Sequence, residues 1–262
     1  MKSRLSGIIF VFLMIFLSLG GVSTPASAAT FDYSVYRTLL EKNVIESGQS
    51  TKVKYAALKK DPSKLIEFNK SVSAISLSEF KGWPKNEQIA FLINAYNSFT
   101  LQIVVQHYPV SSIKKIGGIF GNPWKKKFFQ FLGVESSLDR IEHEILRKDY
   151  KEPRIHFAVN CASIGCPPLQ KLPFEAIRLD EQLEIAARNF VNSSNFNQYD
   201  PTTNTLNLSS IFKWYGSDFG EEKDLRKFFA DRSDLGQPSK DAILKSAKIS
   251  YLDYDWNLNE AK

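Results

Sequence analysis

The chain has 262 residues, of which 43% are hydrophobic and 24% are charged, and its formal net charge is +6. With only 2 Cys and 13 Gly, but with 20 Phe, 10 Tyr and 4 Trp to fill a core, this composition excludes a collagen, a disordered acidic chain and a small disulfide framework. A small positive excess in a sequence of mixed charge does not indicate a nucleic-acid partner.

Residues 1–28 have the pattern of a secretory signal peptide. Lys2 and Arg4 precede an apolar stretch at 8–19, and an Ala-Ser-Ala sequence ends at Ala28. The apolar stretch is shorter than a typical membrane span. We therefore expect cleavage after Ala28, a periplasmic or secreted location, and no stable membrane span in the mature chain.

The remaining residues, 29–262, are expected to form one domain, because no repeat, low-complexity segment or long linker divides them. Apolar residues at helical spacing predict helices over 32–46, 63–71, 86–107 and 174–192. The third of these is apolar on nearly every side, which is typical of a helix in the interior of a protein.

Two amides interrupt this apolar helix. Asn94 and Asn97 lie three residues apart and so share one helix face. Buried amides need hydrogen-bond partners, so these side chains either hold neighbouring backbone or line a polar pocket that binds a ligand. The structural role is the commoner one.

The segment RIHFAVNCASIGCPPL, residues 154–169, carries most of the candidate chemistry. Its alternation predicts a strand over 154–160, which Asn160 would end while capping a helical turn. Cys161 would begin that turn, where free N–H groups and the helix dipole lower the pKa of a thiol and stabilise an oxyanion. Cys161 is therefore a candidate nucleophile.

A nucleophilic thiol needs a base. His156 would lie about 16 Å from Cys161 along an extended strand, too far to be its direct partner. His143 comes from a separate element and can approach through the fold, so it is preferred over His156 and over His107. His156 and Asn160 would then have supporting roles.

The segment IFKWYGSDF places aromatic residues before a carboxylate. Trp214 and Tyr215 are candidate ligand-binding residues, and Asp218 follows two small residues that suggest a turn. Asp218 can orient a catalytic histidine or cap a helix that begins near residue 221, and capping is the commoner role.

The two cysteines have competing interpretations. In an exported protein such a pair of cysteines tends to be oxidised, and a disulfide between Cys161 and Cys166 would consume the nucleophile. A metal site that adds His156 lacks a clear fourth ligand, so no metal and no cofactor is predicted.

Several segments together, AFLINAYNSFT, IEHEILR, RIHFAVNCASIGCPPL, IFKWYGSDF and YLDYDWNLN, resemble the domain of unknown function 547 family over about residues 55–259. The resemblance implies a shared fold and little about activity. It draws attention to the residues of the matching blocks, which are Asn94, Tyr96, Asn97, His143, Arg147, His156, Asn160, Cys161, Ser163, Cys166, Trp214, Tyr215 and Asp218.

The fold predicted from these patterns is α+β: a single domain with a helical layer on a small, mostly antiparallel sheet that includes 154–160, with papain-like enzymes as an analogy. The leading functional hypothesis is an exported thiol hydrolase that cleaves an amide or acyl bond. Its candidate catalytic residues are Cys161, His143, His156, Asn160 and Asp218.

The alternative hypothesis is a non-enzymatic envelope or ligand-binding module with a structural Cys161–Cys166 disulfide. Its partner would be a small molecule or a peptide rather than a nucleic acid. The candidate ligand-binding residues are Asn94, Asn97, Trp214 and Tyr215.

Overall fold

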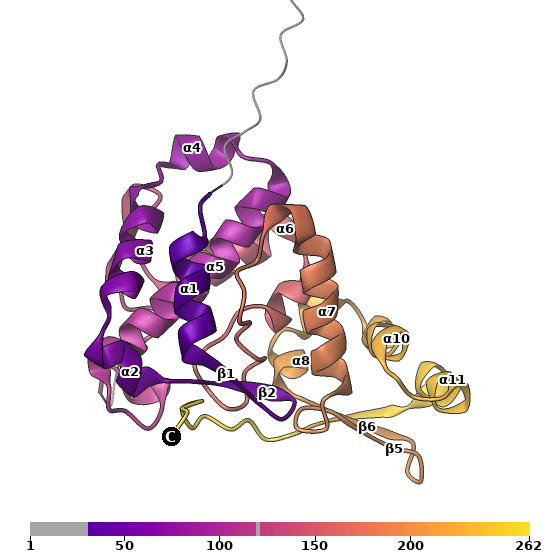
Figure 1. Ribbon diagram of the computed structural model, residues 1–262. Coiled ribbons are helices and arrows are strands. Elements are labelled where there is room, and N and C mark those ends of the chain that lie inside the picture. The colour runs from indigo at the N-terminus through magenta and orange to yellow at the C-terminus, as the bar shows by residue number, and fades with distance from the viewer. Residues whose placement is uncertain (1–30, 119–120) are drawn as a thin grey trace, which may run out of the picture.

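One long helix, α5 (Lys85–His107), forms the centre of the N-terminal half of the protein (Figure 1). The computed structural model describes residues 31–118 and 121–262, so the predicted signal peptide lies outside the described residues. Among those residues, α5 alone is long and apolar enough to cross a membrane, and most of it is buried inside the protein. Its all-round apolar character therefore serves the core, as predicted.

Shorter helices surround α5 and bury its apolar sides. The prediction of a helix over 32–46 is correct in type but too long, because the chain leaves the helix at Asn43 and enters a hairpin that turns at Gly48, whose φ is +60°. The elements are α1 (Ser34–Asn43), β1 (Val44–Ser47), β2 (Ser50–Val53), α2 (Tyr55–Lys60), α3 (Ser63–Ala74) and α4 (Leu77–Gly82).

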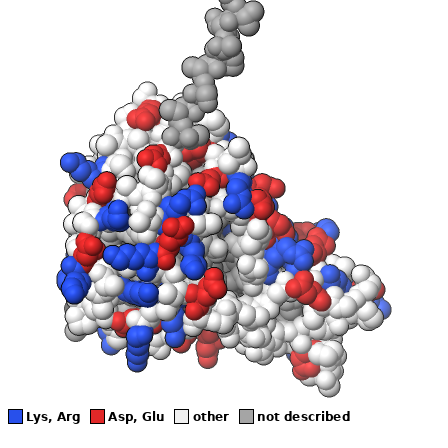
Figure 2. Space-filling view, viewed as in Figure 1, with Lys and Arg blue, Asp and Glu red and all other residues white. Residues whose placement is uncertain are grey.

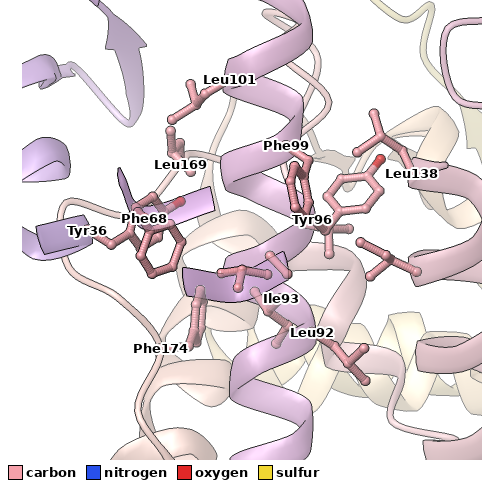
Figure 3. Packing of buried hydrophobic residues seen from close by; sticks show 14 of the residues in the cluster. Tyr36, Phe68, Leu92, Ile93, Tyr96, Phe99, Leu101, Leu138, Leu169 and Phe174 are labelled. Carbon is pink, nitrogen blue, oxygen red and sulfur yellow. The ribbon is translucent and has the colours of Figure 1, made fainter. Parts of the chain in front are cut away.

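Aromatic side chains fill the space on both sides of α5 (Figure 3). Tyr36 of α1 stacks on Phe68 of α3 with ring centroids 4.4 Å apart, and on the other side of α5 Phe99 stacks on Phe129 at 3.7 Å. Rings packed in this way add to the free energy of burial. This first cluster of buried side chains fixes α5 between α1, α3 and the segment that follows.

That segment combines short helical turns with one hairpin. Its elements are η1 (Ile113–Lys115), β3 (Phe129–Phe131), β4 (Val134–Ser136), the π-helix η2 (Arg140–Leu146), α6 (Arg147–Tyr150), η3 (Pro153–Phe157) and η4 (Ala176–Arg178). The N–H of Arg147 donates to the carbonyl of Glu142, five residues earlier, which is the hydrogen bond of a π-helix.

The C-terminal half packs around a second cluster of buried aromatic residues, which includes Phe157, Phe190, Phe212 and Phe219. The predicted helix over 174–192 begins later than expected, at Leu179, after the single turn η4. The elements are α7 (Leu179–Asn192), β5 (Gln198–Asp200), β6 (Thr205–Leu208), α8 (Ser210–Trp214), α9 (Gly216–Phe219), α10 (Glu222–Arg232), α11 (Gln237–Ser246) and β7 (Lys248–Tyr251).

The fold class is α+β, as predicted, but the strands of the described residues form three separate small sheets rather than one. β1 pairs with β2 and β3 with β4, both antiparallel. The third sheet has the order β5-β6-β7, in which β5 and β6 are antiparallel and β6 and β7 are parallel.

The predicted strand over 154–160 is wrong, because η3 is a 3-10 helix. Pro153 fixes the first backbone angle of this helix, and the Glu152 side chain accepts the N–H of Arg154 at 3.1 Å. Ile155 and Phe157 are both buried, but Ile155 lies in the first core and Phe157 in the second. Their alternation therefore reflects two cores rather than one face of a sheet.

The C-terminal tail crosses the molecule as an extended segment after β7 (Figure 1). Asn259 accepts from the N–H of Val53 and donates its own N–H to the carbonyl of Ala162. The tail thus joins the N-terminal hairpin to the segment that holds the cysteines. Figure 2 shows basic and acidic side chains interspersed over the face seen there.

A candidate ligand site beneath a disulfide

Both cysteines of the chain are joined in a disulfide. Cys161 and Cys166 have Cα atoms 6.1 Å apart, and the Tyr254 hydroxyl lies 3.1 Å from each sulfur. No helix begins at Cys161, because Ala162 has a left-handed φ of +63° and the chain continues as a turn. The prediction that a helix dipole activates Cys161 is therefore wrong, and the metal site weighed with His156 is not formed, because neither sulfur is free.

Two asparagines hold the cysteine loop in place. Asn97 donates to the carbonyl of Ala158 at 2.9 Å and accepts the N–H of Asn160 at 2.8 Å. Asn160 in turn accepts the N–H of Ala162 and donates to the carbonyl of Pro167. Because both amide groups contact backbone, these residues position the loop and satisfy its buried polar groups.

Asn94 does the same for the chain before α7. Its side chain donates to the carbonyl of Phe174 at 2.8 Å and accepts the N–H of the same residue at 3.0 Å. Of the two roles considered for Asn94 and Asn97, the contacts are those of the structural one, and neither side chain lines the pocket described next.

A cavity of about 230 Å³ lies beside the disulfide. Its volume is below the range of about 300–1,000 Å³ that is usual for ligand pockets, so it suits a small molecule or one end of a larger one. It brings together residues from η2, η3, α8 and the C-terminal tail, which are far apart in the sequence. The lining includes Asp139, Glu142, His143, His156, Cys161, Cys166, Trp214, Tyr215, Tyr254 and Trp256.

His143 reaches this pocket from the π-helix η2. Its Nδ1 lies 2.8 Å from Nη1 of Arg147, and its Nε2 lies 3.9 Å from the Asp139 carboxylate. A guanidinium can only donate, so Nδ1 accepts and neutral His143 carries its proton on Nε2. His143 therefore has no free lone pair with which to accept a proton, and this geometry does not suit the base predicted from the sequence.

His156 has the opposite arrangement. Its side chain is fully buried, its Nε2 lies 2.7 Å from Oδ2 of Asp218, and its Nδ1 has no hydrogen-bond partner among the residues that the structure describes. Since an ionised carboxylate only accepts, Nε2 donates, and the open Nδ1 is left as the acceptor of the neutral ring. The strand that would have kept His156 far from Cys161 is absent, and both residues line the same pocket.

Asp218 connects the two histidines through Arg147. Arg147 donates to both carboxylate oxygens, at 2.7 and 2.8 Å, in a bidentate pair. Burial raises the pKa of Asp218, but hydrogen bonds from His156 and Arg147 outweigh it and hold the pKa well below its usual value. Asp218 therefore orients a histidine, and the commoner role predicted for it is wrong: Glu221 and Asp224 form the capping box of α10.

Tyr215 packs between these groups. Its ring stacks on His156 with centroids 3.9 Å apart, and its hydroxyl donates to Oε1 of Glu142 at 2.7 Å. Burial, followed by the nearby charge of Glu142, raises the pKa of Tyr215 far above its usual value. Tyr215 is therefore a neutral hydrogen-bond donor at physiological pH.

Aromatic side chains form the outer wall. Trp214 and Trp256 stack with centroids 5.5 Å apart, and Tyr254 packs against both. Tyr254 and Trp256 were not among the predicted site residues, since they come from the tail about 90 positions after the cysteines. The aromatic spacing of the segment YLDYDWN was the available signal. Glu142 was also missed, although it adjoins His143.

Comparison with known proteins gives a family and no closer relative. No curated protein and no solved structure matches this chain, so the papain-like arrangement stays a prediction. A family model described as "Protein of unknown function, DUF547" matches residues 80–191, which include α5, η2 and the cysteine loop. Residues 80–191 therefore match the DUF547 family that the sequence resembles.

Proposed function

We propose that the protein is a ligand-binding module whose pocket, beneath a structural Cys161–Cys166 disulfide, receives a small molecule or one end of a peptide. The observation that carries this proposal is the state of the cysteines. Both sulfurs are bonded to one another, and the Tyr254 hydroxyl contacts each of them. The pocket they line combines aromatic walls with a few buried polar groups, which is the usual composition of a small-molecule site.

An exported location fits this proposal. The predicted signal peptide would deliver the chain to an oxidising compartment, where a disulfide persists. The disulfide closes a short loop, and a loop of this length is expected to stabilise the fold by about 2 kcal/mol. In this proposal the bond is part of the pocket wall rather than part of a reaction.

The test is to count free thiols in the purified protein, native and denatured, before and after reduction. We expect none without a reductant and two after denaturation and reduction. A variant with both Cys161→Ser and Cys166→Ser should have a free energy of unfolding about 2 kcal/mol lower, and it should still bind the ligands of the parent protein. A free, alkylatable Cys161 in the unreduced native protein would overturn the proposal.

A thiol hydrolase is the second candidate, favoured by the unpartnered Nδ1 of His156, a residue that lines the same pocket as the two cysteines. A dithiol reductant would supply two electrons and two protons to give two thiols. His156 would take the proton of Cys161, the thiolate would attack an acyl carbon, and the leaving group would depart with that proton. Water would then hydrolyse the thioester and restore the thiol.

This candidate predicts a reactive thiol in the reduced protein. After mild reduction, Cys161 should alkylate below neutral pH, and His156→Ala should abolish this reactivity while His107→Ala leaves it unchanged, since His107 bonds to its own helix. Alkylation of Cys161 with an ordinary thiol pKa in the reduced protein would eliminate the hydrolase.

A further inference from the structure

We propose that the ligand of this pocket is a protonated primary or secondary amine. The inference rests on the proposed binding function and names the chemical class of ligand. It comes from three kinds of group in the pocket wall: carboxylates without a strong cationic partner, an unpartnered imidazole nitrogen, and aromatic faces.

The first kind of group is a pair of carboxylates. Glu142 is 3% exposed, and it accepts a hydrogen bond from Tyr215 but forms no ion pair within the described residues. Within the part of the chain that the structure describes, the Asp139 carboxylate has only the distant contact of 3.9 Å with Nε2 of His143. No lysine or arginine belongs to the lining among the residues that the structure describes. A buried carboxylate without a counterion is costly, and an ammonium group would neutralise it.

The second kind of group is the unpartnered Nδ1 of His156. This atom is buried and has no hydrogen-bond partner among residues 31–118 and 121–262, and His156 lines the pocket. Because Nε2 donates to Asp218, Nδ1 can only accept while the ring is neutral. An ammonium N–H supplies the donor that this nitrogen lacks. A quaternary ammonium has no N–H and cannot do so.

The third kind of group is the aromatic wall. A cation over a ring face is attracted by the electrons of the ring. Two such contacts already occur here: Nζ of Lys114 lies 4.6 Å from the ring centroid of Trp256, and the guanidinium of Arg147 lies 4.9 Å from that of Tyr215. The pocket's own aromatic rings therefore attract cations at its edge.

Together these groups select against other ligands of the same size. An organic anion would meet the Glu142 and Asp139 carboxylates and would be repelled. A neutral alcohol can satisfy His156 but leaves Glu142 without a counterion. A primary amine satisfies both, so the expected order of affinity is amine, then quaternary ammonium or alcohol, then carboxylate.

The test is a titration of the purified protein at pH 7 with four probes of similar length: pentylamine, pentyltrimethylammonium, pentanol and hexanoate. Three of the four tryptophans line the pocket, so quenching of tryptophan fluorescence reports binding, and calorimetry checks it. We expect pentylamine to bind tightest. Glu142→Gln should weaken the binding of pentylamine roughly tenfold or more. Asp139→Asn should weaken it about threefold, because the Asp139 carboxylate is partly exposed.

Asp234→Asn, which removes an exposed carboxylate remote from the pocket, is the matched control and should leave binding unchanged. Circular dichroism establishes whether each variant is folded. If Glu142→Gln does not fold, Asp139→Asn still tests the proposal. The amine proposal would be overturned if pentanol or hexanoate bound as tightly as pentylamine or more tightly, or if neither Glu142→Gln nor Asp139→Asn weakened pentylamine binding. Either outcome would leave the ligand-binding pocket in place. Binding of none of the four probes would overturn both proposals.

Discussion

Asp218 is the side chain on which the polar part of the site depends. It accepts two hydrogen bonds from Arg147 and one from His156, and a quarter of its side chain is exposed. These bonds lower its pKa in the folded protein, although burial opposes them. A carboxyl group with a depressed folded pKa stabilises the fold above its unfolded pKa of about 3.9, and this stability is lost as the pH falls from there towards the folded pKa.

Replacing Asp218 with Asn should therefore lower the free energy of unfolding by about 2–4 kcal/mol at pH 7, because Arg147 would stay partly buried without its counterion. The deficit should shrink by about 1 kcal/mol between pH 5 and pH 3, where the wild-type protein loses its linkage stabilisation. Urea unfolding at both pH values measures this difference. Asp234→Asn, in an exposed ion pair, should cost less than about 1 kcal/mol at either pH. A loss of stability for Asp218→Asn that does not change with pH would contradict the lowered pKa of Asp218 in the folded protein.

The individual site residues could be predicted from sequence only where the chemistry was local. A disulfide across four intervening residues and a carboxylate that orients a histidine were both among the possibilities considered. For the base, the contact of Arg147 with Nδ1 of His143 favours His156 over the predicted His143, and the local sequence does not specify which nitrogen Arg147 contacts. The contacts of Tyr254 with the cysteines span about 90 residues, and nothing in the local pattern specifies them.

At the scale of elements, α5 and η3 show what periodicity can and cannot predict. A long helix that is apolar all round must be buried away from water, and the short flanking segments favour a protein core, so the sequence predicts α5 closely. In η3, alternating apolar residues arise from two cores on opposite sides of a tight helical turn. Nothing in the sequence of η2 marks it as a π-helix, because its apolar residues have ordinary helical spacing.

The connection between α5 and the cysteine loop makes a specific prediction. Asn97→Ala would leave the carbonyl of Ala158 and the N–H of Asn160 buried without partners. We expect a loss of about 2–4 kcal/mol in the free energy of unfolding, with the disulfide still formed. Ser98→Ala, on the same helix, removes only a bond to its own helix and should cost about 1 kcal/mol or less. Chemical denaturation measures the loss for both variants. Similar losses would argue against the role of Asn97 in holding the cysteine loop.

At the scale of the whole molecule, the two clusters of buried side chains are joined rather than independent. The short helix η3 places Ile155 in the first cluster and Phe157 in the second. The tail adds a second connection, since Asn259 contacts Tyr55 near the N-terminal hairpin and Ala162 in the cysteine loop. The pocket lies where these connections meet, so its geometry depends on both halves.

This joining predicts that the protein unfolds as one unit. Phe68→Ala in the first cluster and Phe190→Ala in the second each delete a buried ring and should each cost about 3–5 kcal/mol. Because the halves share η3 and the tail, both variants should lower the midpoint of the same single transition, seen alike by circular dichroism and by tryptophan fluorescence. Ile177→Ala, which removes a side chain that is 93% exposed, is the control and should leave the midpoint unchanged. Two transitions, each shifted by only one of the two phenylalanine variants, would mean that residues 29–262 form two domains and that the pocket lies between units that can open independently.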